Sequence, residues 1–259
     1  MIKKLSVALA IYNEEGNLKD CLNSVKDLAW EIVIVDGGSK DKSVEIAKSF
    51  NAKIIQTDNP LIFHINKNIA IDIAKGDWIL QLDADERVTK ELANEIRKVI
   101  NQPSDIDGYW IPRRNFFLGK FLTKGGQYPD YTLRLYRKGK GRLPAKDVHE
   151  QAQVWGKVDF LKNDLLHFRD TSFTKYIDGL NRYTDLISTQ MREKGIRIGI
   201  GSFLDYFLLK PMVWFLKTYL RHKGFMDGFP GFIFALFSAF RFPLSYMKYT
   251  LRKDEKGVL

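Results

Sequence analysis

Short apolar runs alternate with amphipathic stretches through the first hundred residues of the chain. The runs cover residues 5–11, 31–35, 53–56 and 78–82. Their length and their content of Ile, Val and Leu are typical of buried strands. Between them, apolar residues recur at helical spacing, as Leu18, Leu22 and Val25 do. Strands that alternate with helices predict a mostly parallel sheet covered on both faces, so we expect a Rossmann-like α/β half at residues 1–100.

Beyond Pro103 the alternation stops. Strands are expected at residues 108–113 and 132–137, with a loop rich in Gly and aromatic residues between them, and further short strands at 148–160. Asn17, Thr89 and Ser172 stand where helices are expected to begin, and we expect each side chain to cap its helix.

The chain after Ser202 becomes aromatic and basic. Its uninterrupted apolar run, residues 229–240, is shorter than the roughly 20 residues that a membrane-spanning helix needs. The alternatives are core helices or helices that lie in a membrane interface. Aromatic residues interleaved with Lys and Arg favour the interface; they are Trp214, Tyr219, Phe225, Phe229, Phe232, Tyr246 and Tyr249.

Charge is unevenly distributed. Of the net +10, residues 1–100 carry −2, whereas residues 101–169 and 170–259 carry +6 each. A basic face suits nucleic acid, anionic lipid or phosphorylated substrates, but the aromatic residues lie in apolar runs, which argues against a nucleic-acid groove. The single Cys21 excludes a disulfide framework and lies on an apolar helix stripe, so we expect a buried, inert thiol in a reducing compartment. The first apolar run ends in acidic residues without a cleavage-like site, so we expect no signal peptide.

Acidic residues follow directly after the strand at 78–82, in the sequence Asp83-Ala84-Asp85-Glu86. They should lie at the carboxyl edge of the sheet, where open α/β sheets bind ligands. Such close carboxylates repel one another, and a divalent cation that also binds phosphate oxygens would relieve the repulsion. Alone, the motif is more often a solvated acidic turn before a helix.

Two further strand ends should meet these acids at the same edge: Tyr12-Asn13-Glu14-Glu15 and Asp36-Gly37-Gly38-Ser39. The Asp36 carboxylate can accept hydrogen bonds from a base or a ribose, and the glycines leave room for a ring. The glycine-rich motifs of dinucleotide and P-loop sites are missing, which disfavours those ligands. A diphosphate would then have to be neutralised by a cation and by Arg or Lys.

These three motifs resemble family 2 glycosyltransferases of the GT-A fold, and within that family the lipopolysaccharide core β-glucosyltransferase group. The group also shows patterns like Tyr128-Pro129-Asp130, Leu133-Arg134-Leu135-Tyr136-Arg137 and Val148-His149-Glu150. The resemblance covers roughly residues 5–190. It implies a GT-A catalytic domain at residues 1–170, divided into a nucleotide-sugar half (1–100) and an acceptor half (101–170), and leaves residues 171–259 as a helical extension.

The resemblance also implies an inverting transfer from a nucleotide-diphosphate sugar, UDP-glucose or similar, to a lipopolysaccharide-core or other lipid-linked saccharide. The enzyme would use Mg²⁺ or Mn²⁺ and work in the cytoplasm, at the anionic inner face of the cytoplasmic membrane. Asp85 would bind the cation, with His167 as a further ligand. The expected donor-binding residues are Ala10, Tyr12, Asn13, Glu14, Asp36, Gly37, Asp83, Ala84 and Arg134.

Inversion in one displacement needs a base for the acceptor hydroxyl. Glu150 is the first candidate, Asp130 the second and Glu86 the third. Arg134 and Arg137 are expected to share one face of a strand and to bind phosphate or an anionic acceptor.

Other functions remain open. A polyprenyl-phosphate acceptor is the main rival to a core saccharide. A sugar nucleotidyltransferase would usually carry a Gly-rich, Arg-containing loop after its first strand, where this chain has Tyr12-Asn13-Glu14-Glu15. A non-catalytic membrane or nucleic-acid binding module fits the basic half least well.

Overall fold

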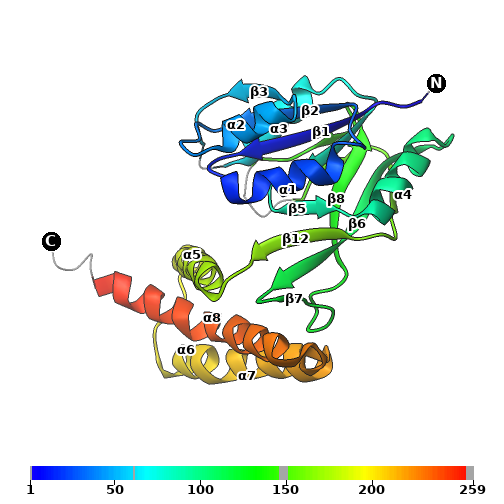
Figure 1. Cartoon of the computed structure of the whole chain (residues 1–259). Helices are drawn as coiled ribbons and strands as arrows, with labels where there is room; N and C mark the ends of the chain where they lie inside the picture. The colour runs from blue at the N-terminus through cyan, green and yellow to red at the C-terminus, as the bar shows by residue number, and fades with distance from the viewer. Residues whose placement is uncertain (1, 61, 146–150, 255–259) are drawn as a thin grey trace. The chain divides into compact units, whose positions relative to one another are not determined.

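A computed structural model of the chain describes residues 2–60, 62–145 and 151–254 (Figure 1). The strands are β1 (Leu5–Ile11), β2 (Glu31–Asp36), β3 (Lys53–Gln56), β4 (Trp78–Leu82), β5 (Glu86–Val88), β6 (Ile106–Phe117), β7 (Lys120–Phe121), β8 (Asp130–Arg137), β9 (Gly141–Arg142), β10 (Gln153–Val154), β11 (Lys157–Phe160) and β12 (Leu165–Asp170). The helices are α1 (Glu15–Val25), α2 (Ser43–Ser49), α3 (His64–Ile73), α4 (Lys90–Asn101), α5 (Phe173–Glu193), α6 (Ile200–Leu204), α7 (Lys210–Phe215) and α8 (Gly228–Asp254). Two π-helical segments, η1 (Asp205–Leu209) and η2 (Leu216–Arg221), and a 3-10 turn, η3 (Gly224–Asp227), complete the set.

The chain forms two compact units. The first comprises Met1–Arg114 and Asp130–His167, and the second comprises Asn115–Pro129 and Phe168–Leu259. The segment between β6 and β8 therefore belongs with the carboxy-terminal helices, although its two ends join strands of the first unit.

The main sheet is mixed. Strands β3, β2, β1 and β4 are adjacent in this order and parallel, as the alternating sequence pattern predicts. The order continues with β8, β6, β12 and β5, where β8 is antiparallel to both β4 and β6, and β12 is antiparallel to β5. Strands β9 and β10 form a separate pair. The parallel half is thus extended by antiparallel strands whose partners lie far away in the sequence.

Helices cover both faces of the parallel half. Side chains alternate along each strand, so successive residues pack against helices on opposite faces. Strand β1 shows the alternation: Val7 and Leu9 pack with α1 and α4, whereas Ala8 packs on the opposite face with α3. Figure 1 shows α1 lying along β1. Burial on both faces fixes the register of these strands, and with it the positions of their carboxyl ends.

The expected bounds of β1, β3 and β4 are confirmed. Thr89 and Ser172 cap α4 and α5, where their hydroxyls accept hydrogen bonds from the amides of Leu92 (3.1 Å) and Lys175 (3.3 Å). The cap expected at Asn17 is wrong: α1 begins at Glu15, and Asn17 lies inside its first turn, where its side chain donates to Glu14. The sequence pattern also gave no sign of β5.

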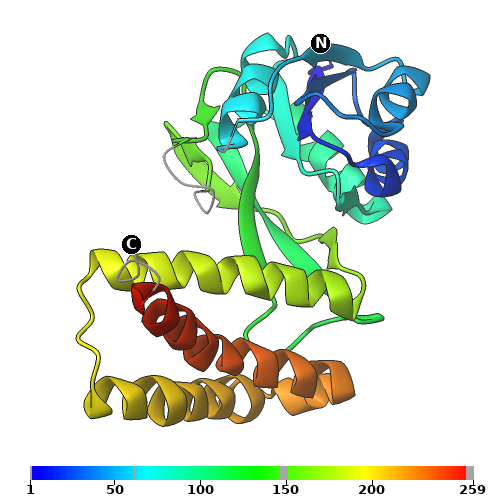
Figure 2. The ribbon, with the colours of Figure 1, turned by 90° about the vertical axis from the view of Figure 1, so that its left-hand side faces the viewer.

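In the second unit, α8 lies between α5 and the rod formed by α6, η1, α7 and η2 (Figures 1 and 2). Tyr246 and Tyr249 of α8 are buried with Met191 of α5. The buried Asp227 accepts hydrogen bonds from the amides of Thr123 and Lys124, which ties residues 115–129 to the helices.

The apolar run at residues 229–240 is part of a longer helix than the sequence suggested. Within the described residues, one helical stretch, Gly224–Leu251, is long and apolar enough to cross a membrane by length and composition, with a mean hydropathy of 1.2. The core helix of a soluble protein satisfies the same criteria. Here α8 packs against both α5 and α7.

The Gly76→Ala substitution should destabilise the first unit. A Cβ at this position would lie 2.7 Å from the Ser6 backbone nitrogen and 2.8 Å from the Lys4 carbonyl oxygen, so β1 would have to move away from β4. We expect urea denaturation to show a free energy of unfolding lowered by about 2 kcal/mol.

Gly16→Ala is the matched control, because a Cβ there meets no atom within 4 Å and Gly16 lies in α1. We expect this change to stabilise the chain by about 0.5 kcal/mol, from helix propensity alone. Equal stability of the two variants would show that β1 and β4 are not in close contact at Gly76.

Candidate active site

Three strand ends meet at one edge of the sheet, as predicted. In the parallel register Ile11 of β1 pairs with Asp36 of β2, and Leu9 of β1 pairs with Leu82 of β4. A hollow of about 280 Å³ opens at this edge. It is lined by Ala10, Ile11, Tyr12, Glu14, Asn59, Phe63, Asn66, Lys67, Asp83, Ala84, Asp85 and His167. The hollow therefore brings together most of the residues expected to bind a donor and a cation.

The loops after β1 and β2 hold each other in place. Asn13 has a left-handed backbone (φ 54°), its amide donates to Ser39 Oγ (2.8 Å), and its side-chain oxygen accepts from the Lys40 amide (2.8 Å). The Glu14 amide donates to Ser43 Oγ (2.7 Å). Asn13 does not line the hollow and instead fixes the loop that carries Tyr12 and Glu14.

Asp36 is fully buried at the end of β2. Its carboxylate accepts hydrogen bonds from the amides of Gly38 (3.2 Å) and Ser39 (3.1 Å) and thereby shapes its own turn. The space beside Gly37 is occupied by Asn59, whose Cβ would lie 3.2 Å from a Cβ at residue 37. Neither Asp36 nor Gly37 is part of the lining of the hollow.

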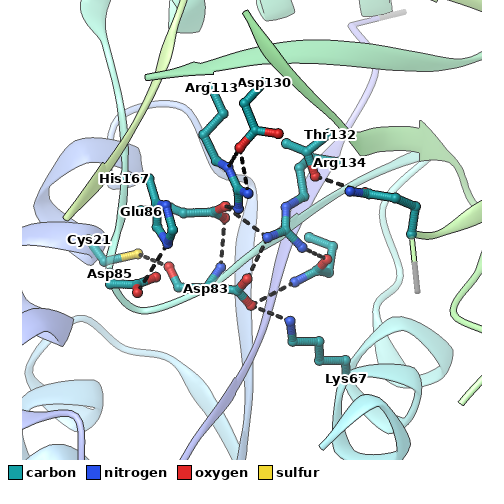
Figure 3. Close-up of polar contacts among 12 residues, drawn as sticks. Cys21, Lys67, Asp83, Asp85, Glu86, Arg113, Asp130, Thr132, Arg134 and His167 are labelled. Carbon is teal, nitrogen blue, oxygen red and sulfur yellow. Dashed lines mark hydrogen bonds and ion pairs between the residues drawn. The ribbon is translucent and has the colours of Figure 1, made fainter. Parts of the chain in front are cut away.

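Asp83 is held by two cations (Figure 3). Its two carboxylate oxygens pair with Lys67 of α3 and with Arg134 of β8, and Gln81 Nε2 also donates to it (3.3 Å). Burial by itself would raise the pKa of Asp83, but the charges of Arg134 and Lys67 outweigh it and hold that pKa well below its usual range. Asp83 is therefore a neutralised anion at neutral pH.

The same ion pairs continue away from the hollow. Arg134 also donates to Glu86 Oε1 (2.8 Å), Arg113 pairs with Glu86 (3.3 Å), and Arg113 donates to Asp130 through Nε (3.0 Å) and Nη2 (2.8 Å). The charge row, as we call it, alternates in sign along six residues: Lys67, Asp83, Arg134, Glu86, Arg113 and Asp130 (Figure 3).

Asp85 lies outside the charge row, and its side chain faces His167. The imidazole Nε2 lies 3.3 Å from Asp85 Oδ2. Burial would raise the pKa of Asp85, but the hydrogen bond and charge of His167 outweigh it and lower that pKa. The pairing of β12 with β5 places His167 opposite Glu86, next to Asp85. Asp85 is thus an ionised acid without a Lys or Arg ion pair in the described residues.

These two side chains suit a divalent cation that is shared with a substrate. In the part of the chain that the structure describes, no three His, Cys, Asp or Glu side chains gather as a metal-binding group. Mg²⁺ sites in proteins commonly use one or two carboxylates, with substrate phosphates and water as the other ligands. The pair Asp85 and His167, which lines the hollow, fits that kind of site.

Arg134 and Arg137 do not act together, so the expectation of a shared face is wrong. Residues three apart in a strand point to opposite faces, so the strand pattern itself does not place these two side chains together. Strand β8 also bulges at Arg134, where Leu135 pairs with Tyr109 and Leu133 with Trp110 and Arg134 is the extra residue. Arg134 points into the charge row. Arg137 instead donates to the carbonyl oxygens of Ile106 (2.9 Å) and Ser104 (2.8 Å).

The three candidate bases, Glu150, Asp130 and Glu86, differ in whether the structure describes them and in how far they are buried. Glu150 and His149 lie outside the described residues. Glu86 is fully buried and accepts hydrogen bonds from Arg134, Arg113 and the Asp83 amide (2.9 Å), so it is a structural acid. Asp130 is partly exposed and pairs with Arg113.

Sequence reasoning missed Lys67 and Arg113 of the charge row, and Asn59, Phe63 and Asn66 of the lining of the hollow. Lys67 is one of three buried polar residues in succession on α3, after Asn66 and before Asn68. Buried polar residues on an otherwise Ile-rich helix were the available signal. Arg113 gave no such signal, because its partners lie 17 and 27 positions away in the sequence. Cys21 is buried, as expected, and burial raises the pKa of its thiol.

Comparison with known proteins identifies a family and several relatives. The family model described as "Glycosyl transferase family 2" matches residues 6–152. Lipopolysaccharide core biosynthesis glycosyltransferase LpsC of Rhizobium meliloti (strain 1021) is 31% identical over 251 residues, which cover 92% of this chain and 90% of LpsC. The glycosyltransferase RT0209 of Rickettsia typhi is 28% identical over 254 residues, with coverage of 92% and 84%.

Solved structures share the fold. Mannosyltransferase PcManGT from Pyrobaculum calidifontis, in complex with GDP-Man and Mn²⁺, gives a TM-score of 0.57 at 13% identity and covers 98% of this chain and 88% of its own. S. aureus TarS 1-349 in complex with UDP gives a TM-score of 0.50 at 17% identity, with coverage of 87% and 75%. These likenesses concern the fold alone, and they confirm the expected GT-A arrangement with a helical carboxy-terminal segment.

The Arg134→Ala substitution should disrupt the charge row. It leaves the buried Glu86 and the partly buried Asp83 each short of a cation, and we expect the free energy of unfolding to fall by roughly 3 kcal/mol. Arg142→Ala removes an exposed ion pair with Asp72 (2.7 Å) and should cost less than about 1 kcal/mol. Urea denaturation of both variants measures the difference, and similar losses would contradict a structural role for the row.

Proposed function

The chain belongs to glycosyl transferase family 2, and from this premise we propose that it is an inverting transferase. Its donor is a nucleoside-diphosphate sugar, UDP-glucose or a similar compound. Its acceptor is a saccharide of the lipopolysaccharide core, in keeping with the likeness to LpsC. The enzyme works in the cytoplasm, at the inner face of the cytoplasmic membrane.

One observation carries the proposal: Asp85 and His167, 3.3 Å apart, line a hollow at the carboxyl edge of the parallel strands. A nucleoside diphosphate fits such an edge. Tyr12 and Phe63 contribute exposed rings to the lining, and Lys67 contributes a fixed positive charge. Two proteins of this fold, TarS and PcManGT, are solved in complex with UDP and with GDP-Man, which supports a nucleotide-linked donor.

Asp85 and His167 would hold Mg²⁺ or Mn²⁺. When bound, the cation stabilises the negative charge that develops on the leaving diphosphate. Asp83 then has a different role. Through Lys67 and Arg134 it fixes the loop after β4, so that Asp85 keeps its direction toward the hollow. The backbone of Ala10 and Tyr12, together with Glu14 and Ala84, would contact the donor. Asn13, Asp36 and Gly37 do not line the hollow and would act indirectly, by fixing the loops after β1 and β2.

The reaction is a single displacement at the anomeric carbon. The acceptor hydroxyl oxygen forms a bond to this carbon while the bond to the diphosphate oxygen breaks, and the hydroxyl proton passes to a carboxylate. Glu150 is the proposed base, on the strength of its sequence motif, and Asp130 is the alternative. Because Arg113 donates two hydrogen bonds to Asp130, a proton on that carboxylate would compete with the ion pair.

The release of product nucleotide tests the function before any acceptor is known. The full-length chain should hydrolyse slowly one member of a panel of UDP-, GDP- and TDP-sugars with Mn²⁺ present. Lipopolysaccharide core fragments should accelerate that release. Acceleration by polyprenyl phosphate instead would identify that compound as the acceptor. If no sugar nucleotide releases its nucleotide, with or without an acceptor, the proposal is refuted.

The Asp85→Ala variant should keep its fold and lose turnover by roughly a thousandfold, about 4 kcal/mol of transition-state stabilisation. The loss is expected because the remaining cation ligand is His167 alone. Asp72→Asn, an exposed acid paired with Arg142, is the control and should turn over as the wild type does. Undiminished activity of Asp85→Ala, or of the wild type in excess chelator, would refute the metal role.

The Glu150→Gln variant should bind the donor normally and fail to transfer, because the amide accepts no proton from the hydroxyl. Binding of UDP by calorimetry and transfer by product analysis separate the two effects. Asp130→Asn, measured in parallel, should retain transfer. The reverse result would assign the base to Asp130.

A further inference from the structure

The second unit exposes a row of aliphatic side chains along one helical rod. Residues 200–221 are continuously helical, with α6 and α7 alternating with the π segments η1 and η2 (Figure 2). Side chains are 43 to 59% exposed in the aliphatic row, which consists of Leu204, Leu208, Met212, Leu216 and Leu220, flanked by Leu209 and Val213. Single exposed apolar residues are ordinary on a soluble protein, but a continuous row marks an interaction surface.

The π segments keep this row straight. In an ideal α-helix, residues four apart drift by about 40° around the axis at each step, since 3.6 residues make a turn. A π segment closes i→i+5 hydrogen bonds and takes up more residues per turn, so it reduces the drift. Five residues spaced by four can therefore remain on one side of the rod. π segments of this kind are frequent at functional sites.

The opposite side of the rod is already occupied by α8. Trp214 Nε1 donates to Ser238 Oγ (3.2 Å), Phe215 lies edge-on to Phe232, and Tyr206 stacks on Tyr246. The aromatic residues that suggested a membrane interface from the sequence thus mostly pack between helices. The exposed side of the rod is mainly aliphatic, with Phe203 exposed near its amino end.

The charges around the aliphatic row are mostly positive. The exposed charged residues from 194 to 228, a stretch that is described throughout, are Lys194, Arg197, Lys217, Arg221 and Lys223, and the exposed acid Glu193 lies just before it. The two acids of this stretch are paired: Asp205 with Lys210 (2.7 Å), and the buried Asp227 with Lys120 (3.6 Å). A surface that is apolar and predominantly basic complements anionic lipid, and it would repel a second copy of itself.

An apolar hollow of about 410 Å³ opens at the amino end of the row. Ile200, Phe203 and Phe207 of the rod line it, together with Tyr246 and Met247 of α8. The Tyr246 hydroxyl is satisfied by Ser202 Oγ (2.9 Å), so the lining offers hydrocarbon and few free polar groups. The hollow therefore extends the apolar surface of the row, and its apolar lining suits an acyl chain.

We propose that the rod lies in the interface of an anionic bilayer, with the aliphatic row among the acyl chains and its basic residues at the lipid phosphates. In this arrangement α8 does not cross the bilayer but stays packed against α5 and α7, although only 33% of its apolar window is buried. The inference rests on the proposed function only for the location of the acceptor. An in-plane helix of this kind buries its apolar side about 5–10 Å deep.

Sedimentation with vesicles of phosphatidylcholine, with and without phosphatidylglycerol, tests this surface. The full-length wild type should bind the anionic vesicles, and added salt should weaken the binding. The Leu208→Ser/Met212→Ser double variant should bind them at least roughly tenfold more weakly. Ile2→Ser/Val158→Ser removes two exposed aliphatic side chains of the first unit and should bind as the wild type does.

Three outcomes would overturn the proposal. They are a wild type that binds neither vesicle, a Leu208→Ser/Met212→Ser variant that binds as the wild type does, and a wild-type dimer that this variant converts to a monomer in sedimentation velocity. Membrane retention of the variant in alkaline carbonate would point to α8 as an anchor and would overturn it equally. Donor hydrolysis, measured on the same samples, should be unchanged; its absence in the wild type would refute the proposed function and leave the vesicle result standing.

Discussion

The candidate site depends on the ion pairs of Asp83. An ionised carboxylate that is removed from water costs several kcal/mol unless cations and hydrogen bonds compensate it. Lys67 and Arg134 supply that compensation, and Arg134 is in turn balanced by Glu86. Because three cations and three acids alternate, the charge row needs no further ion. Asp85 of the same loop has no Lys or Arg ion pair in the described residues, and it lines the hollow beside His167.

This division of labour distinguishes two acids that look equivalent in the sequence. Asp83 and Asp85 stand two positions apart after one strand, and repulsion between them was the argument for a cation. In the structure Lys67 and Arg134 neutralise the first acid, whereas the second lies beside His167 with no Lys or Arg ion pair in the described residues, which is why we propose it as the cation ligand. The ion pairs of Asp83 hold the loop between β4 and β5, and in the proposed mechanism this fixes the position of Asp85 for cation binding.

Local periodicity was sufficient to predict the parallel half of the sheet and the meeting of its strand ends. Each buried strand reveals itself by its own residues, and the carboxyl ends of parallel strands necessarily share an edge. The neighbours of that edge could not be predicted in this way. His167 reaches Asp85 through the pairing of β12 with β5, and Arg134 reaches Asp83 through the pairing of β8 with β4. Both depend on partners about 50 to 80 residues away, on which no local pattern reports.

The carboxy-terminal unit shows a similar limit. Its composition predicted helices and an apolar, basic surface, but not which residues would be exposed. Aromatic rings such as Trp214 are used between helices, where they fill irregular space, and π segments align aliphatic residues on the outer side. A search for hydrophobic periodicity assumes 3.6 residues per turn, so it cannot predict a helix that departs from this value.

The central claim is that Asp85, and not Asp83, binds the cation in the nucleotide pocket. A crystal structure with UDP and Mn²⁺, in which anomalous scattering locates the metal, tests it directly. The account predicts Mn²⁺ in contact with Asp85 and His167, while Asp83 keeps its ion pairs with Lys67 and Arg134. Mn²⁺ on Asp83 with Arg134 displaced, or Mn²⁺ and UDP bound away from this hollow, would contradict it.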